Sequence, residues 1–587
     1  MSQSATDSDG GSAVSSPDSG GLLTDRRFKL GLTVVVAFCS IAYELVYSQF
    51  LTVFYGGTVV RYSITIGLYM FSLGIGALLS GQLGDPESNL LRTEVYLSVA
   101  GPVGAGFIIA LNSVPNVAFP GKYTVTLVLA HLPIIVVGVL SGFEIPLLDE
   151  LVEDREGSLF SALGSLYPRR VVRGVLGVFF DVSDSDGRSL SEVLGADYIG
   201  SLVGTVVYAL VLYPRFGLVV TVLVLGLLNA VAALAFAAWT LTGTSASRSR
   251  PTVGNWRAVV VVGLLVTGTY GGLVANGETV DRTVTGAYMG DRIADEYRPG
   301  SVEIDVQSYD TTAYQRITLY ERRIESHAGP EQCLRLDSAL QLCDSWVDSY
   351  HSGLVDVPMS MYENQSSVDV LLVGGGDYVA VNHLRAYNVS VDQVDIDGEF
   401  LEYTKNRSYF EQYHDDAYEY DRLNTTVGDA YTYLRGTDKE YDLILLDVPG
   451  ARSDDALPLY SEEFYTLLGR HLTDRGVVVS WVYSEYTYPQ HNKAYHNTVA
   501  AAGFDRHLPY SVVDDLDGDG EYERGERFYV LSDGPTPTPD LARAHGEYVD
   551  RNADRLAPFE WQRLPTYRGV ESNSVFDPNY DIIVGYT

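Results

Sequence analysis

Residues 368–397 read VDVLLVGGGDYVAVNHLRAYNVSVDQVDID, and this stretch predicts a β-α-β unit. The apolar run Val370–Val373 has the length of a buried strand, and the turn Gly374–Asp377 follows it directly. Glycines allow a sharp turn and a close approach of the backbone to a ligand, and an acid at the end of the next strand, Asp395, can accept both ribose hydroxyls. We interpret the unit as nucleoside-binding, with an ordinary strand-to-helix turn as the alternative.

The same alternation of predicted strands and helices continues toward the C-terminus. Asp429 follows a strand-like stretch, and Asp447 ends the apolar run that begins at Tyr441. Ligands of open parallel sheets bind beyond the carboxyl ends of the strands. We therefore expect Asp377, Asp395, Asp429 and Asp447 to meet in one pocket, with solvated acidic turns as the alternative.

The N-terminal half is rich in apolar runs. The chain has 587 residues, 46% of them hydrophobic, which is too long and too mixed for one domain. After a polar tail, expected to be disordered, we count about seven runs long enough to cross the hydrocarbon core of a bilayer. They are Leu30–Phe50, Ser63–Leu83, Val95–Leu111, Thr124–Leu148, Tyr198–Tyr213, Gly217–Trp239 and Ala258–Ala275. Small residues such as Gly76 and Gly200 recur in these runs and permit close helix packing.

Lys and Arg residues are concentrated in alternate loops, beginning with the segment before the first apolar run. This bias predicts a cytoplasmic N-terminus and, with an odd number of spans, an exterior soluble half; the short run Val171–Phe180 is interpreted as interfacial. Cys333 and Cys343 lie symmetrically about Ser338, so a tight hairpin would bring them within disulfide reach. Lasting disulfides are typical of compartments outside the cytoplasm, and four N-glycosylation sequons, the first at Asn364, agree with export.

Four ionisable residues lie in or beside the apolar runs, namely Glu44, His131, Glu144 and Asp197. In hydrocarbon each would be costly unless it faced a partner or a water-filled cavity. They could line a transport or sensing path, or they could form interhelical hydrogen bonds or lie at the membrane interface. Because the runs show neither an internal repeat nor a broken-helix pattern, we expect interhelical hydrogen bonds or interfacial positions.

Acidic residues outnumber basic ones, with 75 Asp and Glu against 40 Lys and Arg, and the net charge is -35. This excess argues against nucleic acid as a partner, since phosphate contacts need clustered cations. Dispersed acidic residues with few lysines are instead the composition of an acidic, halophilic-type protein that stays soluble in high salt.

Residues 515–526 match the calcium-loop pattern D-x-D-x-D-G-x5-E. The ligand positions are Asp515, Asp517, Asp519, Glu521, Glu523 and Glu526, with Gly520 at the sharp turn. The flanks 507–513 and 527–531 are strand-like. We therefore predict a calcium loop within a hairpin, with a solvated acidic loop as the alternative.

An ordered series of motifs resembles those of the spermidine synthases, the aminopropyltransferases that move an aminopropyl group from decarboxylated S-adenosylmethionine to a diamine. The likeness covers roughly residues 309–503. The matching segments are Tyr314-Gln315, Leu336–Gln341, Tyr350-His351, Gly374-Gly375-Gly376-Asp377, Val394–Asp397, Gly428-Asp429, Asp447 and Leu459–Tyr465. The apolar half, with Tyr43-Glu44-Leu45 and residues 195–200, is similar to the membrane-fused members of that family.

The resemblance implies a donor site made of five side chains and the glycine turn. Asp377 would orient the amine of the donor, Asp395 would hold the ribose, and Asp429 would bind the adenine amino group. Gln315 and Gln341 would line the same site. The backbone of the turn Gly374, Gly375 and Gly376 would lie against the nucleoside. The co-substrate implied is decarboxylated S-adenosylmethionine.

The acceptor site departs from the family pattern. The resemblance implies that Asp447 and Tyr350 are catalytic: they would position the diamine and take its proton, because only a neutral amine can attack the carbon bound to the sulfonium. Gly450, however, stands where the family has a second loop aspartate, Ser352 replaces a glutamate, and Tyr378 replaces a glycine. Half of the acceptor site is thus missing from the sequence.

The sequence therefore predicts a multi-pass α-helical membrane region followed by a small β-domain and an α/β Rossmann-type, methyltransferase-like domain. The expected parts are a tail at 1–29, a membrane domain at 30–275, a β-hairpin domain at 300–352, the Rossmann-like domain at 353–534 and a C-terminal extension at 535–587. We expect a membrane-anchored aminopropyltransferase acting on a small amine such as putrescine. The alternatives are a calcium-stabilised exterior domain that binds a nucleoside or amine, and an S-adenosylmethionine-dependent methyltransferase. A homo-oligomer is compatible with the sequence.

Overall fold

The computed structural model describes residues 19–55, 59–112, 122–153, 189–242 and 256–582, apart from 296, 298–299, 328, 338, 452–453, 517 and 535. The chain divides into two compact units. The helical unit comprises Met1–Phe50, Ile64–Ile108 and Tyr123–Val280, and the α/β unit comprises Leu51–Ser63, Ile109–Lys122 and Asp281–Thr587. The predicted interfacial run at 171–180, most of the predicted tail and the predicted ligand Asp517 lie outside the described residues.

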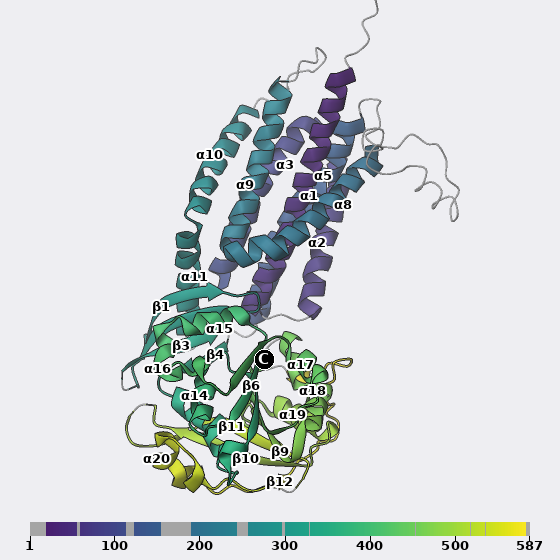
Figure 1. Cartoon of the computed structure of the whole chain (residues 1–587). Coiled ribbons are helices and arrows are strands. Elements are labelled where there is room, and N and C mark those ends of the chain that lie inside the picture. Colours follow the sequence, from purple (N-terminus) through teal and green to yellow (C-terminus); the bar gives the residue numbers. More distant parts are fainter. Residues whose placement is uncertain are drawn as a thin grey trace, which may run out of the picture. The chain divides into compact units, whose positions relative to one another are not determined.

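The helical unit is built from apolar helices that run side by side (Figure 1). They are α1 (Ser19–Tyr55), α2 (Val59–Ser80), α3 (Pro86–Asn112), α4 (Lys122–Ala130), α5 (Leu132–Glu153), α8 (Ser189–Val207), α9 (Tyr213–Thr242) and α10 (Trp256–Ala275). Six helical stretches of the described chain are long and apolar enough to cross a membrane. One of them, Ser191–Leu241, contains two of the predicted runs, joined by a kink at Gly217 (φ 64°), so the six stretches cover all seven predicted runs.

Glycines allow the helices of this unit to approach one another closely, as their spacing predicted. A Cβ atom on Gly76 of α2 would collide with the carbonyl oxygen of Val139 in α5. A Cβ atom on Gly200 of α8 would collide with the carbonyl oxygen of Val34 in α1. Small residues therefore set the packing distance at these two helix pairs.

The α/β unit begins with helix α11 (Gly277–Ala294) and a four-stranded antiparallel sheet of order β1-β2-β3-β4. The strands are β1 (Val302–Thr311), β2 (Arg316–Ile324), β3 (Pro330–Leu336) and β4 (Ala339–Cys343). In the β3–β4 hairpin Cys333 pairs with Cys343, and the two form a disulfide. The hairpin predicted around Ser338 is therefore confirmed by the pairing of the flanking strands.

A mixed eight-stranded sheet of order β12-β10-β11-β9-β8-β5-β6-β7 forms the centre of this unit. Its parallel strands are β5 (Asp369–Gly374), β6 (Ser390–Asp395), β7 (Leu423–Val427), β8 (Tyr441–Asp447) and β9 (Leu472–Trp481). The antiparallel strands are β10 (Arg506–Asp514), β11 (Glu523–Ser532) and β12 (Gln562–Arg563). The flanking helices are α12 (Val347–His351), α13 (Val357–Met359), α14 (Val379–Arg385), α15 (Gly398–Lys405), α16 (Ser408–His414), α17 (Ala430–Gly436), α18 (Glu462–Arg470), α19 (Pro489–Ala501) and α20 (Glu547–Leu556).

Helices cover both faces of the sheet because its central strands are apolar on both sides. Val370 and Leu372 of β5 belong to one hydrophobic core, and the alternate residues Leu371 and Val373 belong to the other. This is the burial pattern of a parallel sheet with two covered faces. The C-terminal residues pack into the same cores, since Tyr548 and Leu556 of α20 lie in the first core and Leu564 lies in the second.

Candidate functional site

The glycine turn after β5 lies directly against the end of β8. Gly374 and Gly375 have positive φ angles of 83° and 68°. Gly374 pairs with Asp447 across the two strands, and the Gly375 N–H donates to the carbonyl oxygen of Asp447 over 3.1 Å. A Cβ atom on Gly374 would collide with that carbonyl oxygen. Glycine is therefore required here both by its backbone angle and by the close approach of β8.

Three acidic or imidazole side chains converge beside this turn. The hydroxyl of Tyr350, on α12, donates to Oδ1 of Asp447 over 2.9 Å. Nε2 of His351 lies 3.9 Å from Oδ2 of Asp377 and 4.0 Å from Oδ2 of Asp447. The His351 side chain is fully buried, its Nδ1 lies 2.7 Å from the carbonyl oxygen of Val347, and its Nε2 has no hydrogen-bond partner among the described residues.

Burial and mutual repulsion perturb these groups strongly. Burial, followed by the negative charges of Asp377 and Asp395, raises the pKa of Asp447 to about 8. Burial lowers the pKa of His351 to about 4, so the imidazole is neutral at physiological pH. Burial also raises the pKa of Tyr350 well above its ordinary value, and Asp447 raises it further. A protonated Asp447 beside a neutral histidine is a poised acid–base pair of the kind found at functional sites.

Asp395 ends β6 on the other side of the glycine turn. Its Oδ1 accepts the N–H of Asp397 over 2.8 Å, and a Cβ atom on Gly376 would lie 2.9 Å from its Oδ2. Burial raises the pKa of Asp395 to about 6, with smaller contributions from Asp397 and Asp377. The structure thus places Asp395 at the same edge of the sheet as Asp377 and Asp447.

Asp397 connects the two sheets of the α/β unit. Its Oδ2 accepts hydrogen bonds from Thr312 Oγ1 (2.6 Å) and Gln315 Nε2 (2.9 Å), and its Oδ1 caps α15 through the N–H of Phe400 (3.0 Å). The predicted donor-site residue Gln315 is therefore held at the edge of the large sheet by Asp397, two residues after the end of β6 at Asp395. Gln341 lies half-buried on β4.

Asp429 lies farther out than the other predicted acids. It is exposed, and its Oδ1 caps α17 by accepting the N–H and Oγ1 of Thr432, each over 2.8 Å. Its neighbour Gly428 donates its N–H to the carbonyl oxygen of Asp395 over 2.8 Å, which anchors the turn at the same edge of the sheet. The backbone of Asp429 therefore lies at the same edge of the sheet as the other predicted acids, but its carboxylate faces solvent.

Gly450, where the sequence lacks a second loop aspartate, has no room for a side chain. A Cβ atom there would collide with the hydroxyl of Tyr483 and lie 3.0 Å from the Trp481 ring. Trp481 ends β9, next to β8, and its indole Nε1 donates to Oε2 of Glu526. The space of the missing aspartate is thus filled by aromatic rings, and one of them, that of Trp481, holds another carboxylate.

A β-bulge positions Glu526. The register of β10 and β11 shifts between Ser511 and Val513, where Gly525 and Glu526 of β11 together oppose one residue of β10. A Cβ atom on Gly525 would collide with the carboxylate of Asp514, so the first bulge residue must be small. The bulge turns the Glu526 side chain to the Trp481 indole.

Glu526 belongs electrostatically to the pocket. Its charge contributes to the raised pKa of Tyr350, the residue that holds Asp447. Burial raises the pKa of Glu526 itself, and the Trp481 N–H opposes that rise. Arg527, the next residue, forms its ion pair with Glu485. Sequence reasoning missed both Glu526 and His351 as site residues; Tyr350-His351 was visible as a motif, whereas Glu526 was assigned to a different site.

That different site was the calcium loop, and the structure gives it no support. Glu526, the twelfth ligand position, bonds Trp481. Oδ2 of Asp515 accepts the N–H of Gly520, and Oδ1 of Asp519 accepts the N–H of Glu521, so these two acids close the turn themselves. Glu523 is exposed on β11, and Asp517 lies outside the described residues. The calcium site stays a prediction, although its strand flanks are confirmed by the β10–β11 pairing.

Among the described residues, two groups of side chains have the composition of a metal site. One is His351, Asp377 and Asp447, whose ligand atoms all lie within 4.8 Å of one another. The other is Glu331 with Cys333 and Cys343, whose sulfurs are consumed by the disulfide. The first group is equally suited to an ammonium ion, since a buried acidic pocket favours any cation that can donate hydrogen bonds.

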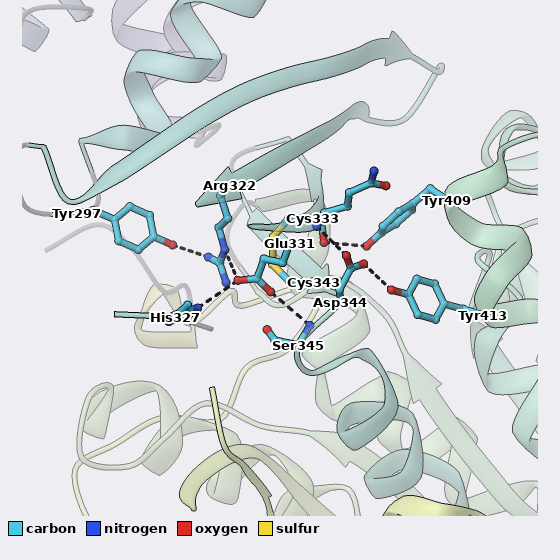
Figure 2. The surroundings of a disulfide bond; sticks show 11 residues. Tyr297, Arg322, His327, Glu331, Cys333, Cys343, Asp344, Ser345, Tyr409 and Tyr413 are labelled. Carbon is cyan, nitrogen blue, oxygen red and sulfur yellow. Dashed lines mark hydrogen bonds and ion pairs between the residues drawn. A yellow bond between two sulfur atoms is a disulfide. The ribbon is translucent and has the colours of Figure 1, made fainter. Parts of the chain in front are cut away.

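The disulfide is surrounded by fully compensated charges (Figure 2). Glu331 accepts from Arg322 Nε over 2.8 Å, and its carboxylate also faces His327 Nδ1 and the N–H of Ser345, each over 3.3 Å. Tyr297 bonds Arg322 on the far side of the guanidinium. This network stabilises the small sheet, whereas the acids beside the glycine turn have fewer compensating partners.

Residues 347–512 match the family model of the spermine/spermidine synthase domain. Polyamine aminopropyltransferase 2 of Ralstonia nicotianae is 28% identical over 489 residues, 82% of this chain and 83% of that protein. Polyamine aminopropyltransferase of Oceanobacillus iheyensis is 25% identical over 454 residues, 76% of this chain and 75% of that protein. Both alignments are longer than the part of the chain that follows Ala275, so they extend into the helical unit. A crystal structure of spermidine synthase from Thermotoga maritima aligns with a TM-score of 0.33 and 19% identity, over 45% of this chain and 80% of that chain.

Proposed function

We propose that this chain, a relative of the spermidine synthases, is a polyamine aminopropyltransferase that acts on a diamine such as putrescine. The observation that carries the proposal is the cluster of buried acids at the carboxyl edge of the sheet. There Asp447, bonded by Tyr350 over 2.9 Å, lies beside Asp377, Asp395 and the glycine turn. A nucleoside-binding turn next to undercompensated acids suits a donor that carries an adenosine and a cationic acceptor.

The reaction joins the acceptor nitrogen to the aminopropyl carbon that is bound to the donor sulfonium. The nitrogen lone pair attacks that carbon, the carbon–sulfur bond breaks, and its electron pair stays on sulfur as a neutral thioether. The nitrogen must lose one proton, and Asp447 is placed to take it. With a pKa of about 8, Asp447 takes this proton in its ionised form, whose population rises as the pH approaches 8 and when a cationic donor or acceptor lies beside it. That form is a stronger base than an ordinary aspartate, which reduces the free-energy cost of proton transfer from an amine.

Donor binding is assigned to the other side of the turn. Decarboxylated S-adenosylmethionine would lay its adenosine along Gly374–Gly376, with its ribose hydroxyls on Asp395 and its amine on Asp377. Gln315, fixed by Asp397 over 2.9 Å, would line the donor site from the small sheet, as would Gln341. The exposed carboxylate of Asp429 would accept the adenine amino group.

The second ammonium of the acceptor would be held by Glu526. This carboxylate replaces the aspartate that Gly450 lacks, because Tyr483 and Trp481 fill the space of the loop side chain and Trp481 holds Glu526 beside Tyr350. His351, buried and neutral, would accept a hydrogen bond from the reacting ammonium through its unpartnered Nε2. The pocket would then offer an acid for each end of a diamine.

The full chain in detergent, incubated with decarboxylated S-adenosylmethionine and putrescine, tests the proposal. We expect equal amounts of spermidine and of the thioether nucleoside, measured by mass spectrometry. Replacing the donor with S-adenosylmethionine should give no methylated amine, which separates this activity from a methyltransferase. A protein that binds the donor but releases neither product would instead favour the non-enzymatic binding domain.

We also propose that the helical unit anchors the protein in a bilayer with the α/β unit on the outer side. Six apolar helical stretches of sufficient length, the alternation of basic loops and the Cys333–Cys343 disulfide support this placement. The donor would then have to be supplied on the same side. Protease added to intact cells should cleave near Gly534; cleavage only after membrane disruption would place the domain in the cytoplasm.

A further inference from the structure

One layer of the helical unit is polar although the layer next to it is apolar. The apolar layer contains Leu32 and Val36 of α1, Leu90 and Leu91 of α3, Leu147 and Leu148 of α5, and Ala232 and Ala233 of α9. One helical turn away, each of these four helices carries a polar residue in its interior-facing stripe. We call Cys39, Glu94, Glu144 and Asn229 the polar layer; their side chains are 1%, 0%, 3% and 1% exposed.

Contacts between the helices show that the four residues lie at the same level along the helix axes. The hydroxyls of Tyr43 and Tyr47 on α1 bond the carbonyls of Leu97 and Gly101, so α1 and α3 are parallel. Lys29, near the start of α1, bonds the carbonyl of Leu151, near the end of α5, so these two helices are antiparallel.

Helix α9 is also antiparallel to α1, since Phe28 stacks on Trp239 at 4.4 Å and Gln49 bonds Tyr213. Residue 229 therefore lies opposite the part of α1 that contains Cys39. Contacts between α9 and α3 give the same result. Gly226 of α9 lies against the carbonyl oxygen of Ser98 in α3, and these two helices are antiparallel. One turn after Gly226 along α9 is Asn229, and one turn before Ser98 along α3 is Glu94, so these two residues lie at the same level.

The carboxyl groups in this layer lack compensation. Neither oxygen of Glu94, nor Oε1 of Glu144, has a hydrogen-bond partner among the described residues, and both polar atoms of the Asn229 side chain are also unpartnered. Glu94 and Glu144 are close enough to interact directly with each other, and Glu94 also interacts with the Cys39 thiol. Among the described residues, the other titratable groups that interact with this pair are Tyr43 on α1, with Glu94, and Tyr69 on α2 and Asp197 on α8, with Glu144, and none of these is a cation.

We propose that Glu94 and Glu144 form a binding site for one small monovalent cation, a proton or a sodium ion, with the Asn229 side chain as its neutral ligand. Two buried carboxylates side by side cannot both stay ionised without a counter-charge. A cation shared between them, with the Asn229 amide oxygen as a third ligand, compensates the unpartnered carboxyl oxygens and that amide oxygen. The site is independent of the aminopropyl-transfer pocket.

Dicyclohexylcarbodiimide tests the proposal on the full chain in detergent. This apolar reagent adds to a protonated carboxyl group: the acid proton moves to a carbodiimide nitrogen, the carboxyl oxygen bonds the central carbon, and the adduct rearranges to an N-acylurea without a leaving group. We expect one adduct, located by peptide mass spectrometry at Glu94 or Glu144. Above the pH at which the pair loses its proton, labelling should fall about tenfold per pH unit.

The identity of the cation follows from a second comparison at constant pH and ionic strength. If sodium occupies the site, labelling is weaker in sodium chloride than in choline chloride; if a proton alone occupies it, the two salts give equal labelling. The double variant E94Q/E144Q should lose the adduct, whereas the matched control Glu44→Gln, also buried and on α1, should keep it. Thermal unfolding of each variant checks its fold.

Two results would overturn the proposal. One is a wild-type protein without an adduct at Glu94 or Glu144 at any pH, because the pair would then hold no exchangeable proton. The other is a folded E94Q/E144Q variant that is labelled as strongly as the wild type, because the reactive carboxyl would then lie elsewhere.

Discussion

Buried carboxyl groups are compensated differently in the two units of this protein. In the α/β unit, Asp397 accepts three hydrogen bonds and Asp356 accepts from His383 and Tyr387 over 2.9 and 2.8 Å. In the helical unit, Glu94 has no partner among the described residues. Compensated acids hold elements together, whereas an undercompensated acid retains the capacity to bind a cation.

The same contrast exists within the α/β unit. Asp447 receives one hydrogen bond from a neutral hydroxyl and repulsion from two neighbouring acids. Asp397, which follows β6 two strands away, accepts hydrogen bonds on both carboxyl oxygens and holds elements of the fold together. The comparison therefore separates structural acids from candidate functional acids by their partners rather than by their burial.

Asp447→Asn should have the largest effect. Removing the proton acceptor should lower kcat/KM for aminopropyl transfer by roughly 10²–10⁴-fold. The fold should be unharmed, because the amide still accepts from Tyr350 and removes a buried charge. Steady-state kinetics and thermal unfolding measured on the same preparation check both statements; a variant that loses stability in parallel with activity would make Asp447 a structural acid.

Asp397→Ala should show the opposite pattern. The change leaves Thr312 Oγ1, Gln315 Nε2 and the Phe400 N–H without their acceptor, and we expect the free energy of unfolding to fall by about 3 kcal/mol. Chemical denaturation measures this loss. Asp310→Ala, which removes an exposed acid paired with Arg407, is the matched control and should change stability little.

Glu526→Gln should weaken acceptor binding more than chemistry. A charge-assisted hydrogen bond contributes about 1.5–3 kcal/mol, so KM for putrescine should rise roughly 10–100-fold while kcat changes less. Glu523→Gln, on the exposed part of the same strand, should leave KM unchanged. If the two variants behave alike, Glu526 does not contact the acceptor; if KM for the donor rises instead, the carboxylate lies on the other side of the pocket.

The pH dependence of stability should differ between the wild type and Asp447→Asn. Burial raises the pKa of Asp447 from 3.8 to about 8, so its contribution is full below pH 3.8 and is lost as the pH rises to about 8. Asp395, raised to about 6, contributes to the lower part of the same range. We expect the ligand-free wild type to lose stability relative to the variant across this window, by at most about 6 kcal/mol. If the stability of the wild type and of the variant changes with pH in the same way, Asp447 is not buried as the structure shows.

Calcium removal should have the smallest effect. Glu526 bonds Trp481, and Asp515 and Asp519 bond their own turn, so a chelator should leave the melting temperature unchanged. If the chelator lowers the melting temperature and added calcium restores it, the loop binds an ion. Glu526 would then be a calcium ligand and not part of the acceptor site.

Much of the catalytic edge was predictable from short patterns. The glycine turn, Asp395 and Asp447 follow apolar runs of strand length, and parallel strands bring their carboxyl ends to one edge. Asp429 was only partly predictable, because helix capping by Thr432 determines where its carboxylate points. Tyr378 takes a left-handed conformation (φ 62°) usually reserved for glycine, and its ring packs against Tyr418 at 5.7 Å, which the local sequence does not indicate.

Sequence alone determined the apolar runs, the α/β order and the paired cysteines, because these depend on residue spacing along one segment. Tertiary structure decided the position of Glu526: a bulge in β11 and an indole on β9 place a residue of calcium-loop spacing near Tyr350. It also decided that Glu94, inconspicuous in an apolar run, meets Glu144 without a compensating partner among the described residues. Which charges face one another depends on contacts between distant segments, and spacing within one segment carries no information about them.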